Sequence, residues 1–213
     1  MNDAYVQYGC GLSAPKSWRN FDASPTLQMQ RLPLLGSLFR SSLFSNKGFL
    51  IFPLNVEHAD IVSGLPLKKE SCDAIYCSHI LEHLALNDFR LALRNTYSYL
   101  KPGGVFRLVL PDLETLAREY LESEDPQASL KFMDESKLGF KDRPRGALGM
   151  LRRLLGNSAH LWMWDFESLS LELKEAGFKE IRRAEFGDSA DPQFKAVEDP
   201  LRWKDCLGME CRK

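Results

Sequence analysis

Short apolar runs alternate along the chain with segments of helical period, which favours an α/β sheet with crossover helices. Strands are predicted at residues 5–8, 17–21, either 50–52 or 56–58, 72–78, 105–110, 179–186 and 206–212. The last two predicted strands follow one another and are joined by a loop. We therefore expect them to form an antiparallel pair at one edge of the sheet.

Helical spacing is clearest between the fourth and fifth of these strands. Residues 79–100 carry apolar side chains near helical period, with a break at which Asn87 or Asp88 is suited to cap a new helix. The sequence Lys-Pro-Gly-Gly at 101–104 should end that helix. Helical spacing returns at 113–123 and at 166–176, where Gly177 stops it.

Length and composition predict one domain over residues 1–213, with lid or insertion segments at 25–48 and 125–160. The net charge of -1 argues against a globally basic nucleic-acid binder. Five scattered cysteines without a CxxC pair predict reduced thiols in a cytoplasmic protein. We expect no signal peptide and no transmembrane helix. The apolar segment 32–44 is interpreted as a lid or packing segment, or as a peripheral membrane contact.

The first candidate for chemistry is the sequence Tyr8-Gly9-Cys10-Gly11, directly after a predicted strand. Glycines there let the backbone pass close to a ligand. Asp22 ends the next predicted strand, where its carboxylate is able to accept hydrogen bonds from both ribose hydroxyls of a nucleoside. The spacing is shorter than the ~20 residues of a dinucleotide fingerprint and a third glycine is missing, which disfavours a pyrophosphate loop. A plain strand–loop–strand turn explains the same residues.

A second acid, Asp60, follows the third predicted strand. Its carboxylate is suited to an adenine amino group, while the backbone amide of Ile61 is suited to a ring nitrogen. As a lone feature, Asp60 equally fits a turn residue or a helix cap.

The most specific signal is the segment SCDAIYCSHILEHL at residues 71–84, which is followed by a predicted helix, LKPGG and a strand. The order of the glycine loop, FDASP, DIVSGLPL, this segment, LKPGGVFRLVLPDLE and WDFESLSLELKEAGF strongly resembles class I methyltransferases of the methyltransferase domain 11 type. The resemblance covers nearly the whole chain. It is closest to bacterial members often found beside surface-polysaccharide genes.

That resemblance implies a Rossmann-like α/β fold, a seven-stranded mostly parallel sheet with helices on both faces and a reversed final strand. It implies S-adenosyl-L-methionine as the cofactor and a small-molecule or saccharide substrate, methylated on oxygen ahead of nitrogen or carbon. Gly9 and Gly11 would approach the amino-acid end of the cofactor, and Asp22 its ribose. The full set of implied cofactor-binding residues is Tyr8, Gly9, Cys10, Gly11, Asp22, Asp60 and Ile61 (both at the adenine), Ser78 and His79 (both near the methionine moiety).

The chain departs from the usual family pattern in its glycine loop. The fuller GxGxG is absent, and the segment from Gly11 to Asp22 leaves little room for a normal first helix. This departure motivates an alternative, a catalytically silent methyltransferase fold that binds a nucleoside or a protein partner. A nucleotide-dependent oxidoreductase is disfavoured by the glycine pattern, and the chain lacks the asparagine-proline-proline-aromatic signature of an RNA methyltransferase.

Two residues are candidates for a catalytic base. His79 lies at a strand end where the pocket should open, and a neutral imidazole there is able to take a proton from a hydroxyl acceptor. Asp112 lies at the carboxyl end of the following strand, although Pro-Asp-Leu-Glu also fits a helix start with Asp112 as the cap. His79 and His83 lie four apart, but no HExxH order and no third ligand stand nearby. We therefore expect no metal and expect His83 to pack or cap.

Two further segments have open interpretations. The aromatic run at 160–165 either roofs the pocket or forms a core strand, with Asp165 capping the following helix. A basic cluster either binds an anionic substrate or forms a solvated surface. Its members are Lys141, Arg143, Arg145, Arg152 and Arg153.

Overall fold

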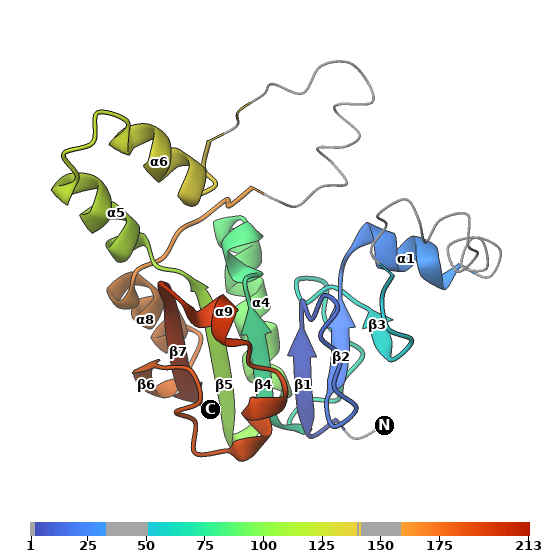
Figure 1. The fold of residues 1–213 in the computed structure, drawn as a ribbon. Coiled ribbons are helices and arrows are strands. Elements are labelled where there is room, and N and C mark those ends of the chain that lie inside the picture. Colours follow the sequence, from blue (N-terminus) through green and yellow to red (C-terminus); the bar gives the residue numbers. More distant parts are fainter. Residues whose placement is uncertain (1–2, 33–50, 140, 142–158) are drawn as a thin grey trace.

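Seven strands form one mixed sheet in the structure, a computed structural model that describes residues 3–32, 51–139, 141 and 159–213 (Figure 1). The strands are β1 (Tyr5–Tyr8), β2 (Arg19–Asp22), β3 (Val56–His58), β4 (Cys72–Ser78), β5 (Leu100–Pro111), β6 (Lys179–Ala184) and β7 (Cys206–Arg212). Their order across the sheet is β3-β2-β1-β4-β5-β7-β6. The first five strands are mutually parallel, and β7 runs antiparallel to β5 and β6. The predicted fold class and the antiparallel pair at the sheet edge are confirmed.

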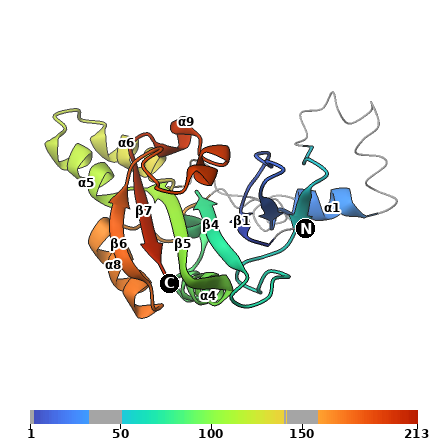
Figure 2. The ribbon, with the colours of Figure 1, turned by 90° about the horizontal axis from the view of Figure 1, so that it is seen from below.

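Helices cover both faces of this sheet, as predicted. The helices are α1 (Pro25–Arg31), α4 (Leu86–Tyr99), α5 (Leu113–Glu122), α6 (Ala128–Glu135), α8 (Phe166–Glu175) and α9 (Pro200–Trp203), with single 3-10 turns η1 (Leu81–His83) and η2 (Pro192–Ala196). Figure 2 shows α4 and α8 on one face of the sheet and α9 on the other. The helices α5 and α6 project beyond the sheet at the end where β4 and β5 stop (Figure 1).

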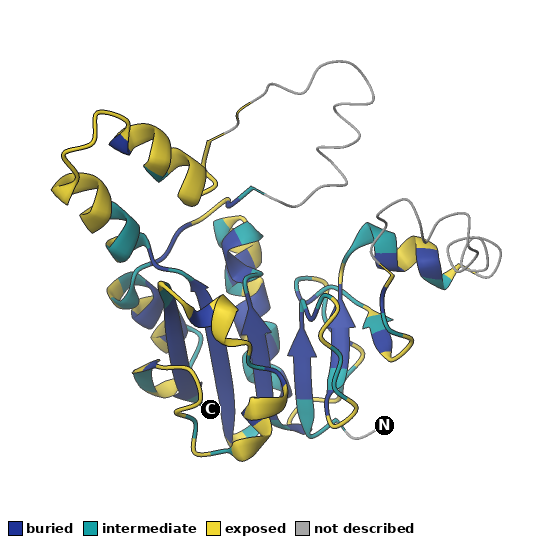
Figure 3. Ribbon diagram, viewed as in Figure 1, coloured by how far each residue is buried: buried dark blue, intermediate teal, exposed yellow. Residues whose placement is uncertain are grey.

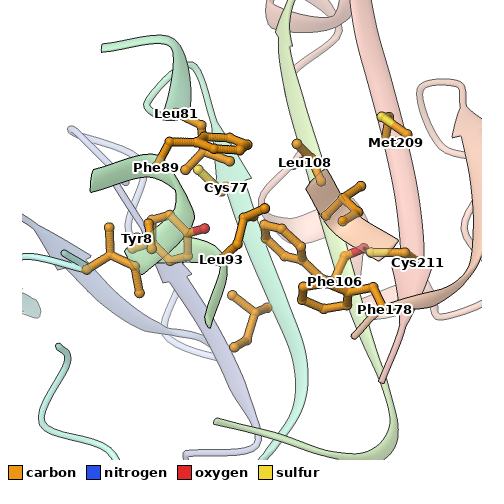
Figure 4. Close-up of a cluster of buried hydrophobic side chains, with 14 of the residues drawn as sticks. Tyr8, Cys77, Leu81, Phe89, Leu93, Phe106, Leu108, Phe178, Met209 and Cys211 are labelled. Atoms are coloured by element: carbon orange, nitrogen blue, oxygen red, sulfur yellow. Dashed lines mark hydrogen bonds between the residues drawn. The ribbon is translucent and has the colours of Figure 1, made fainter. Parts of the chain in front are cut away.

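The central strands are buried on both faces, so their sequences are nearly continuous in apolar residues rather than alternating (Figure 3). Beneath α4 and α8, Phe89 and Leu93 of α4 pack among Tyr8, Phe106 and Phe178 (Figure 4). Each such buried side chain contributes roughly 2 kcal/mol through removal of apolar surface from water.

The opposite face has a smaller aromatic cluster in place of long helices. Trp18 contacts both Tyr5 and Phe194, with ring centroids 5.4 Å apart in each pair. Trp203 of α9 belongs to the same cluster, and its indole N–H donates to the Tyr76 hydroxyl at 3.2 Å. Segments far apart in the sequence therefore close this face of the sheet.

The second and third strands refine the predictions made from the sequence. β2 begins at Arg19 rather than at residue 17, because the Trp18 amide donates to the Pro15 carbonyl in a turn. Of the two alternatives for the third strand, Val56–His58 is the strand, and it pairs with β2. Phe52 is irregular, although its side chain is buried.

The helix predicted from residue 79 begins later, and its predicted cap is wrong. His79 has φ 53°, which is incompatible with a helix that starts directly after β4. The chain instead forms η1, and α4 starts with Ala85 at its N-cap and no side-chain cap. Asn87 and Asp88 lie within the first turn of α4, so neither caps it.

The Lys-Pro-Gly-Gly sequence ends α4 as predicted, but β5 starts at once rather than at residue 105. Residues 101–104 form an irregular stretch of β5, with a register shift opposite β4 between Cys72 and Ala74. Gly103 has φ 78°, a conformation that glycine adopts without strain. A sequence that breaks a helix is here also the beginning of a strand.

The C-terminal region largely follows the predictions. Helix α8 is preceded by Asp165, which accepts from the Ser168 amide at 2.8 Å in a capping box, and it is followed by Gly177 at φ 104°. β6 ends at Ala184, two residues before the predicted end. The five cysteines are free thiols.

The two proposed lid or insertion segments are described in part. Residues 25–31 form α1, and 128–135 form α6, which packs on α5. Residues 33–50, 140 and 142–158 lie outside the described part of the chain, so most of the 32–44 segment and four of the five basic residues do too. Within the described ranges, no helix is long and apolar enough to cross a bilayer.

Candidate active site

A cavity of about 560 Å³ opens at the carboxyl ends of β1, β2, β3 and β4. This volume lies within the ~300–1,000 Å³ that is usual for small-molecule sites. The strand order reverses between β1 and β4, the position at which open α/β sheets bind ligands. The cavity is lined by Tyr8, Gly9, Asp22, Ala23, Ser24, Pro25, Ala59, Asp60, Ile61, Val62, His79, Ile80, His83, Leu84, Ala85, Asp88 and Leu161.

The loop after β1 brings backbone, rather than side chains, to this cavity. Gly9 has φ 66°, and a Cβ atom there would stand 1.9 Å from Cγ1 of Ile80, so only glycine fits. The Tyr8 hydroxyl lies 3.2 Å from Oγ1 of Thr96 in the core, which anchors the start of the loop. Glycine is therefore required at position 9 both by the positive φ and by the close packing of the backbone against Ile80.

Cys10 and Gly11, also predicted to bind the cofactor, do not line the cavity. The Cys10 side chain is buried beside Leu27 and Phe52, and burial raises the pKa of its thiol to about 12. The Gly11 amide donates to Oδ2 of Asp22 at 2.9 Å. The contacts of Cys10 and Gly11 therefore hold the loop in place on the side away from the cavity.

Asp22 lies at the end of β2 and is only 8% exposed, yet it lines the cavity. Its Oδ2 accepts from the Gly11 amide, and its Oδ1 accepts from the Ser24 amide at 2.8 Å. Each carboxylate oxygen retains a further acceptor position. Two backbone amides therefore hold the carboxylate in one orientation at the cavity wall.

Asp60 follows β3 and adopts the turn geometry that the sequence allowed. Its Oδ1 accepts from the Val62 amide at 2.9 Å, and its Oδ2 lies 3.4 Å from the Ser63 hydroxyl. Asp60 and Ile61 both line the cavity. The role of Asp60 as a turn residue is therefore compatible with its position at the cavity wall.

His79 and Ser78 end β4, and α9 holds both of them. Arg202 donates to the Ser78 hydroxyl and to the Ser78 carbonyl, each at 2.7 Å. The Arg202 carbonyl in turn accepts from Nε2 of His79 at 2.8 Å. His79 lines the cavity, whereas Ser78 is buried behind it.

The electrostatics of His79 follow from these contacts. Burial disfavours its charged form, but hydrogen bonds with Cys206, Glu82 and the Arg202 carbonyl outweigh burial and raise the pKa of His79 to about 9. Its φ of 53° is unusual for a residue with a side chain, and such strain clusters at functional sites. The backbone conformation and the hydrogen bonds to α9 together hold this imidazole in a fixed position.

Comparisons with known proteins agree with this architecture. Residues 40–108, about a third of the chain, match the family model of a methyltransferase domain. Among solved structures, the chain resembles an S-adenosylmethionine-dependent methyltransferase from Archaeoglobus fulgidus (16% identity, covering 99% of this chain and 86% of that one, TM-score 0.51). A similar match is a Thermotoga maritima protein described as a possible histamine N-methyltransferase (16%, 99% and 82%, TM-score 0.52).

A third match is a methyltransferase from Haloferax volcanii in complex with the Trm112 methyltransferase activator (14% identity, 100% of this chain and 83% of that one, TM-score 0.50). A search of curated proteins gives no match to the chain. At these identities the solved structures establish the shared fold, and the family model identifies the domain. The chain therefore shares the fold of class I methyltransferases, and its segment 40–108 resembles a methyltransferase domain. The cofactor of this class is S-adenosylmethionine.

Asp112 has the contacts of a helix cap. Its Oδ1 accepts from the Glu114 amide at 3.0 Å at the start of α5, and its Oδ2 lies 3.4 Å from Nη1 of Arg183. Asp112 does not line the cavity. The capping interpretation of the sequence is therefore confirmed, while a role in catalysis stays a prediction.

The aromatic run at 160–165 is not the predicted core strand, because it forms only an isolated bridge between Trp164 and Asp112, but the predicted cap at Asp165 is confirmed. Trp164 is buried, and its ring stacks on Phe89 of α4 with centroids 4.3 Å apart. Asp165 caps α8, and the hydrogen bonds from Ser168 lower the pKa of Asp165. Leu161, by contrast, lines the cavity.

Several cavity residues were not identified as site residues from the sequence. Ser24 and Pro25 come after β2, and Leu84, Ala85 and Asp88 come after η1. Their only signal was proximity to the carboxyl end of β2 or β4, which does not reveal the direction of a side chain. Of the basic cluster only Lys141 is described, and it pairs with Asp134 at 2.8 Å.

Proposed function

We propose that this methyltransferase transfers a methyl group from S-adenosylmethionine to a hydroxyl oxygen of a small molecule or saccharide. The observation that carries the proposal is the cavity at the carboxyl ends of the strands, walled by Gly9, Asp22, Asp60 and His79. Its polar groups suit a nucleoside on one side and a hydroxylated acceptor on the other. The free thiols support the predicted cytoplasmic location.

The residues at the cavity wall are proposed to hold the cofactor in the following way. Asp22 is proposed to accept hydrogen bonds from the ribose hydroxyls, because two amides already orient its carboxylate. Asp60 and the Ile61 amide are proposed to contact the adenine. The backbone of Gly9, which lines the cavity, is proposed to approach the amino-acid end, with Tyr8, Cys10, Gly11 and Ser78 supporting these positions.

Methyl transfer requires the protein mainly to align the acceptor with the methyl group. S-adenosylmethionine supplies a methyl group that its sulfonium makes electrophilic. The chain's own residues then hold the acceptor oxygen in line and exclude water. His79 is the proposed acceptor-side residue, because it lines the cavity and is fixed through Nε2 by the Arg202 carbonyl. Asp112 is the second candidate, behind His79 because Arg183 and the α5 amide already engage it.

The ribose assignment is tested by Asp22→Asn. This change keeps the size of the side chain but removes the charge that strengthens its hydrogen bonds, so S-adenosylmethionine should bind roughly tenfold more weakly. The matched control is Asp73→Asn, which removes a half-exposed carboxylate that pairs with Lys101 outside the cavity. Calorimetric titration measures both. Wild-type affinity in Asp22→Asn refutes the assignment.

The acceptor proposal is tested by transfer of an isotope-labelled methyl group. The panel contains hydroxylated small molecules and saccharides, with amines and RNA as comparison acceptors. We expect label on oxygen, and His79→Gln should lower turnover while leaving cofactor affinity intact. Label on nitrogen, or turnover unchanged in His79→Gln, overturns the acceptor atom or the role of His79, respectively.

One observation favours the silent fold as a second candidate function. The chain passes from β1 to β2 through turns alone, although every residue between these strands is described. The usual first helix of the fold is therefore missing beside the cofactor site. Tight binding of S-adenosylmethionine with no transfer to any member of the panel would favour this alternative.

A further inference from the structure

A buried and poorly paired carboxylate lies directly behind the cavity. Glu82, in the turn η1, is fully buried, and among the described residues neither of its carboxylate oxygens has a hydrogen bond of good geometry; its nearest polar contact is Nδ1 of His79 at 3.3 Å. Buried polar groups are almost always paired, and a buried charge is costly unless it is paired or bound to a metal. The unmet requirement of Glu82 therefore calls for an explanation.

Three of the four histidines of the chain surround this carboxylate. Oε1 of Glu82 lies 3.3 Å from Nδ1 of His79, 3.9 Å from Nε2 of His83 and 4.0 Å from Nε2 of His160. The rings of His83 and His160 meet edge to face, with centroids 4.9 Å apart. One nitrogen of each imidazole is thus directed at the same carboxylate.

The contact of the other ring nitrogen of His83 determines which tautomer its neutral ring adopts. Nδ1 lies 3.0 Å from the Ala159 carbonyl, which only accepts, so Nδ1 carries the proton of a neutral ring. The lone pair of Nε2 then faces Glu82. A histidine that donates one N–H to a carbonyl and presents its other nitrogen inward has the usual arrangement of a metal ligand.

Backbone hydrogen bonds bring the distant third residue into place. The amides of Leu161 and Trp162 both donate to the Glu82 carbonyl, at 2.8 and 3.2 Å. They fasten the segment that begins at His160 against η1. The sequence suggested no third ligand for His79 and His83, because His160 approaches them only through these tertiary contacts.

We propose that Glu82, His83 and His160 bind a divalent transition-metal ion. Their ligand atoms lie within 4.8 Å of one another. Zinc bonds of about 2.0–2.2 Å require the three atoms to close slightly around the ion. Two imidazoles with one carboxylate suit Zn²⁺ and its neighbours, whereas Mg²⁺ and Ca²⁺ prefer oxygen ligands. His79, in contact with Oε1, orients the carboxylate.

The place of the site gives it access to the cavity. His83 lines the cavity, whereas Glu82 and His160 are buried behind it. A set of two histidines and one glutamate leaves at least one coordination position for a further ligand. The inference concerns metal binding alone, so it holds or fails independently of the proposed acceptor.

The test is a titration of the purified full chain, made without a polyhistidine tag and freed of metal by chelation. Co²⁺ serves as the probe, because its visible absorption reports coordination and a near-ultraviolet band reports thiolate ligands. We expect one equivalent of Co²⁺ with no thiolate band, displaced by Zn²⁺ but not by Mg²⁺. Glu82→Gln, His83→Gln and His160→Gln should each weaken binding at least tenfold.

The matched control is His58→Gln, which changes the exposed fourth histidine on β3 and should bind as the wild type does. Circular dichroism establishes that each variant is folded. Should a variant not fold, paramagnetic shifts of the imidazole protons of Co²⁺-loaded wild type still identify the ligands. No saturable site, a thiolate band, displacement by Mg²⁺, or equal affinity in the cluster variants and His58→Gln would overturn the proposal.

Discussion

Two buried charged clusters, one around Arg107 and one around Glu82, differ in how completely they are paired. On the face with α9, the guanidinium of Arg107 is fully buried and pairs with Glu198 at 2.5 Å, Asp188 at 2.8 Å and Glu210 at 3.1 Å. The Glu185 carbonyl accepts a further hydrogen bond at 2.6 Å. Glu82, beside the cavity, has no such partners among the described residues.

The difference indicates different roles. Arg107 also stacks on Trp203, 4.5 Å from the ring centroid, so the chain itself satisfies every side of this charge. Such a cluster fixes the structure of a face that has no long helix to cover it. In the Glu82 cluster, the Nε2 atoms of His83 and His160 lie 3.9 and 4.0 Å from Oε1 beside the cavity, distances that leave room for a bound ion.

The largest expected effect on stability comes from breaking the ion pairs around Arg107. Arg107→Leu leaves Glu198 buried without a counter-charge and Glu210 with Arg182 alone, which should lower the free energy of unfolding by about 3–5 kcal/mol. Urea unfolding at neutral pH measures the change. Lys101→Met, which removes a half-exposed pair with Asp73, should cost under about 1 kcal/mol. A loss in Arg107→Leu no larger than in this control would contradict the structural role.

A smaller effect is expected at the cluster of Glu82, His83 and His160, where a bound metal ion should stabilise the protein. Zn²⁺ at about a hundredfold excess over its dissociation constant should raise the free energy of unfolding of the wild type by about 2.7 kcal/mol. His160→Gln should gain far less, while His58→Gln should gain as much as the wild type. Equal gains in all three proteins would place the metal elsewhere.

The smallest expected effect is the loss of stability at acid pH that comes from Asp188, a member of the cluster around Arg107. Although partial burial opposes it, hydrogen bonds from Arg182 and Arg107 lower the pKa of Asp188 to about 2. Because this folded-state pKa lies below the unfolded value of about 3.9, the stabilisation is complete above that value. It is lost as the pH falls from roughly 4 to 2. Asp188 is partly exposed, so about 1 kcal/mol is expected.

Unfolding free energies at pH 7 and pH 3 test this expectation in the wild type and in Asp188→Asn. The wild type should lose more stability than the variant between these two pH values, by part of that amount. An identical loss in both proteins would show that the pairing of Asp188 with the two arginines contributes nothing.

The sequence predicted the central strands well, for a physical reason. β4 and β7 have the predicted bounds, because both faces of these strands are buried and their apolar runs are unambiguous. The start of α4 was missed, since the left-handed backbone at His79 and an N-cap at Ala85 leave no mark in a hydrophobic period.

The candidate site could be predicted by position but not by direction. Asp22, Asp60 and His79 all line the cavity, as expected for residues at the carboxyl ends of parallel strands. Ser78 and Gly11 belong to the same motifs but are turned to α9 and to Asp22. The approach of His160 to Glu82 depends on tertiary hydrogen bonds, which no local pattern reveals.

The most direct test of the central claim is isothermal titration of the folded protein with S-adenosylmethionine, S-adenosylhomocysteine and NAD. The cavity, with an oriented Asp22 and no room for a pyrophosphate loop between β1 and β2, predicts micromolar binding of both adenosyl ligands and none of NAD. Binding of NAD alone, or of none of the three by correctly folded protein, would contradict the assignment of this cavity as the cofactor site.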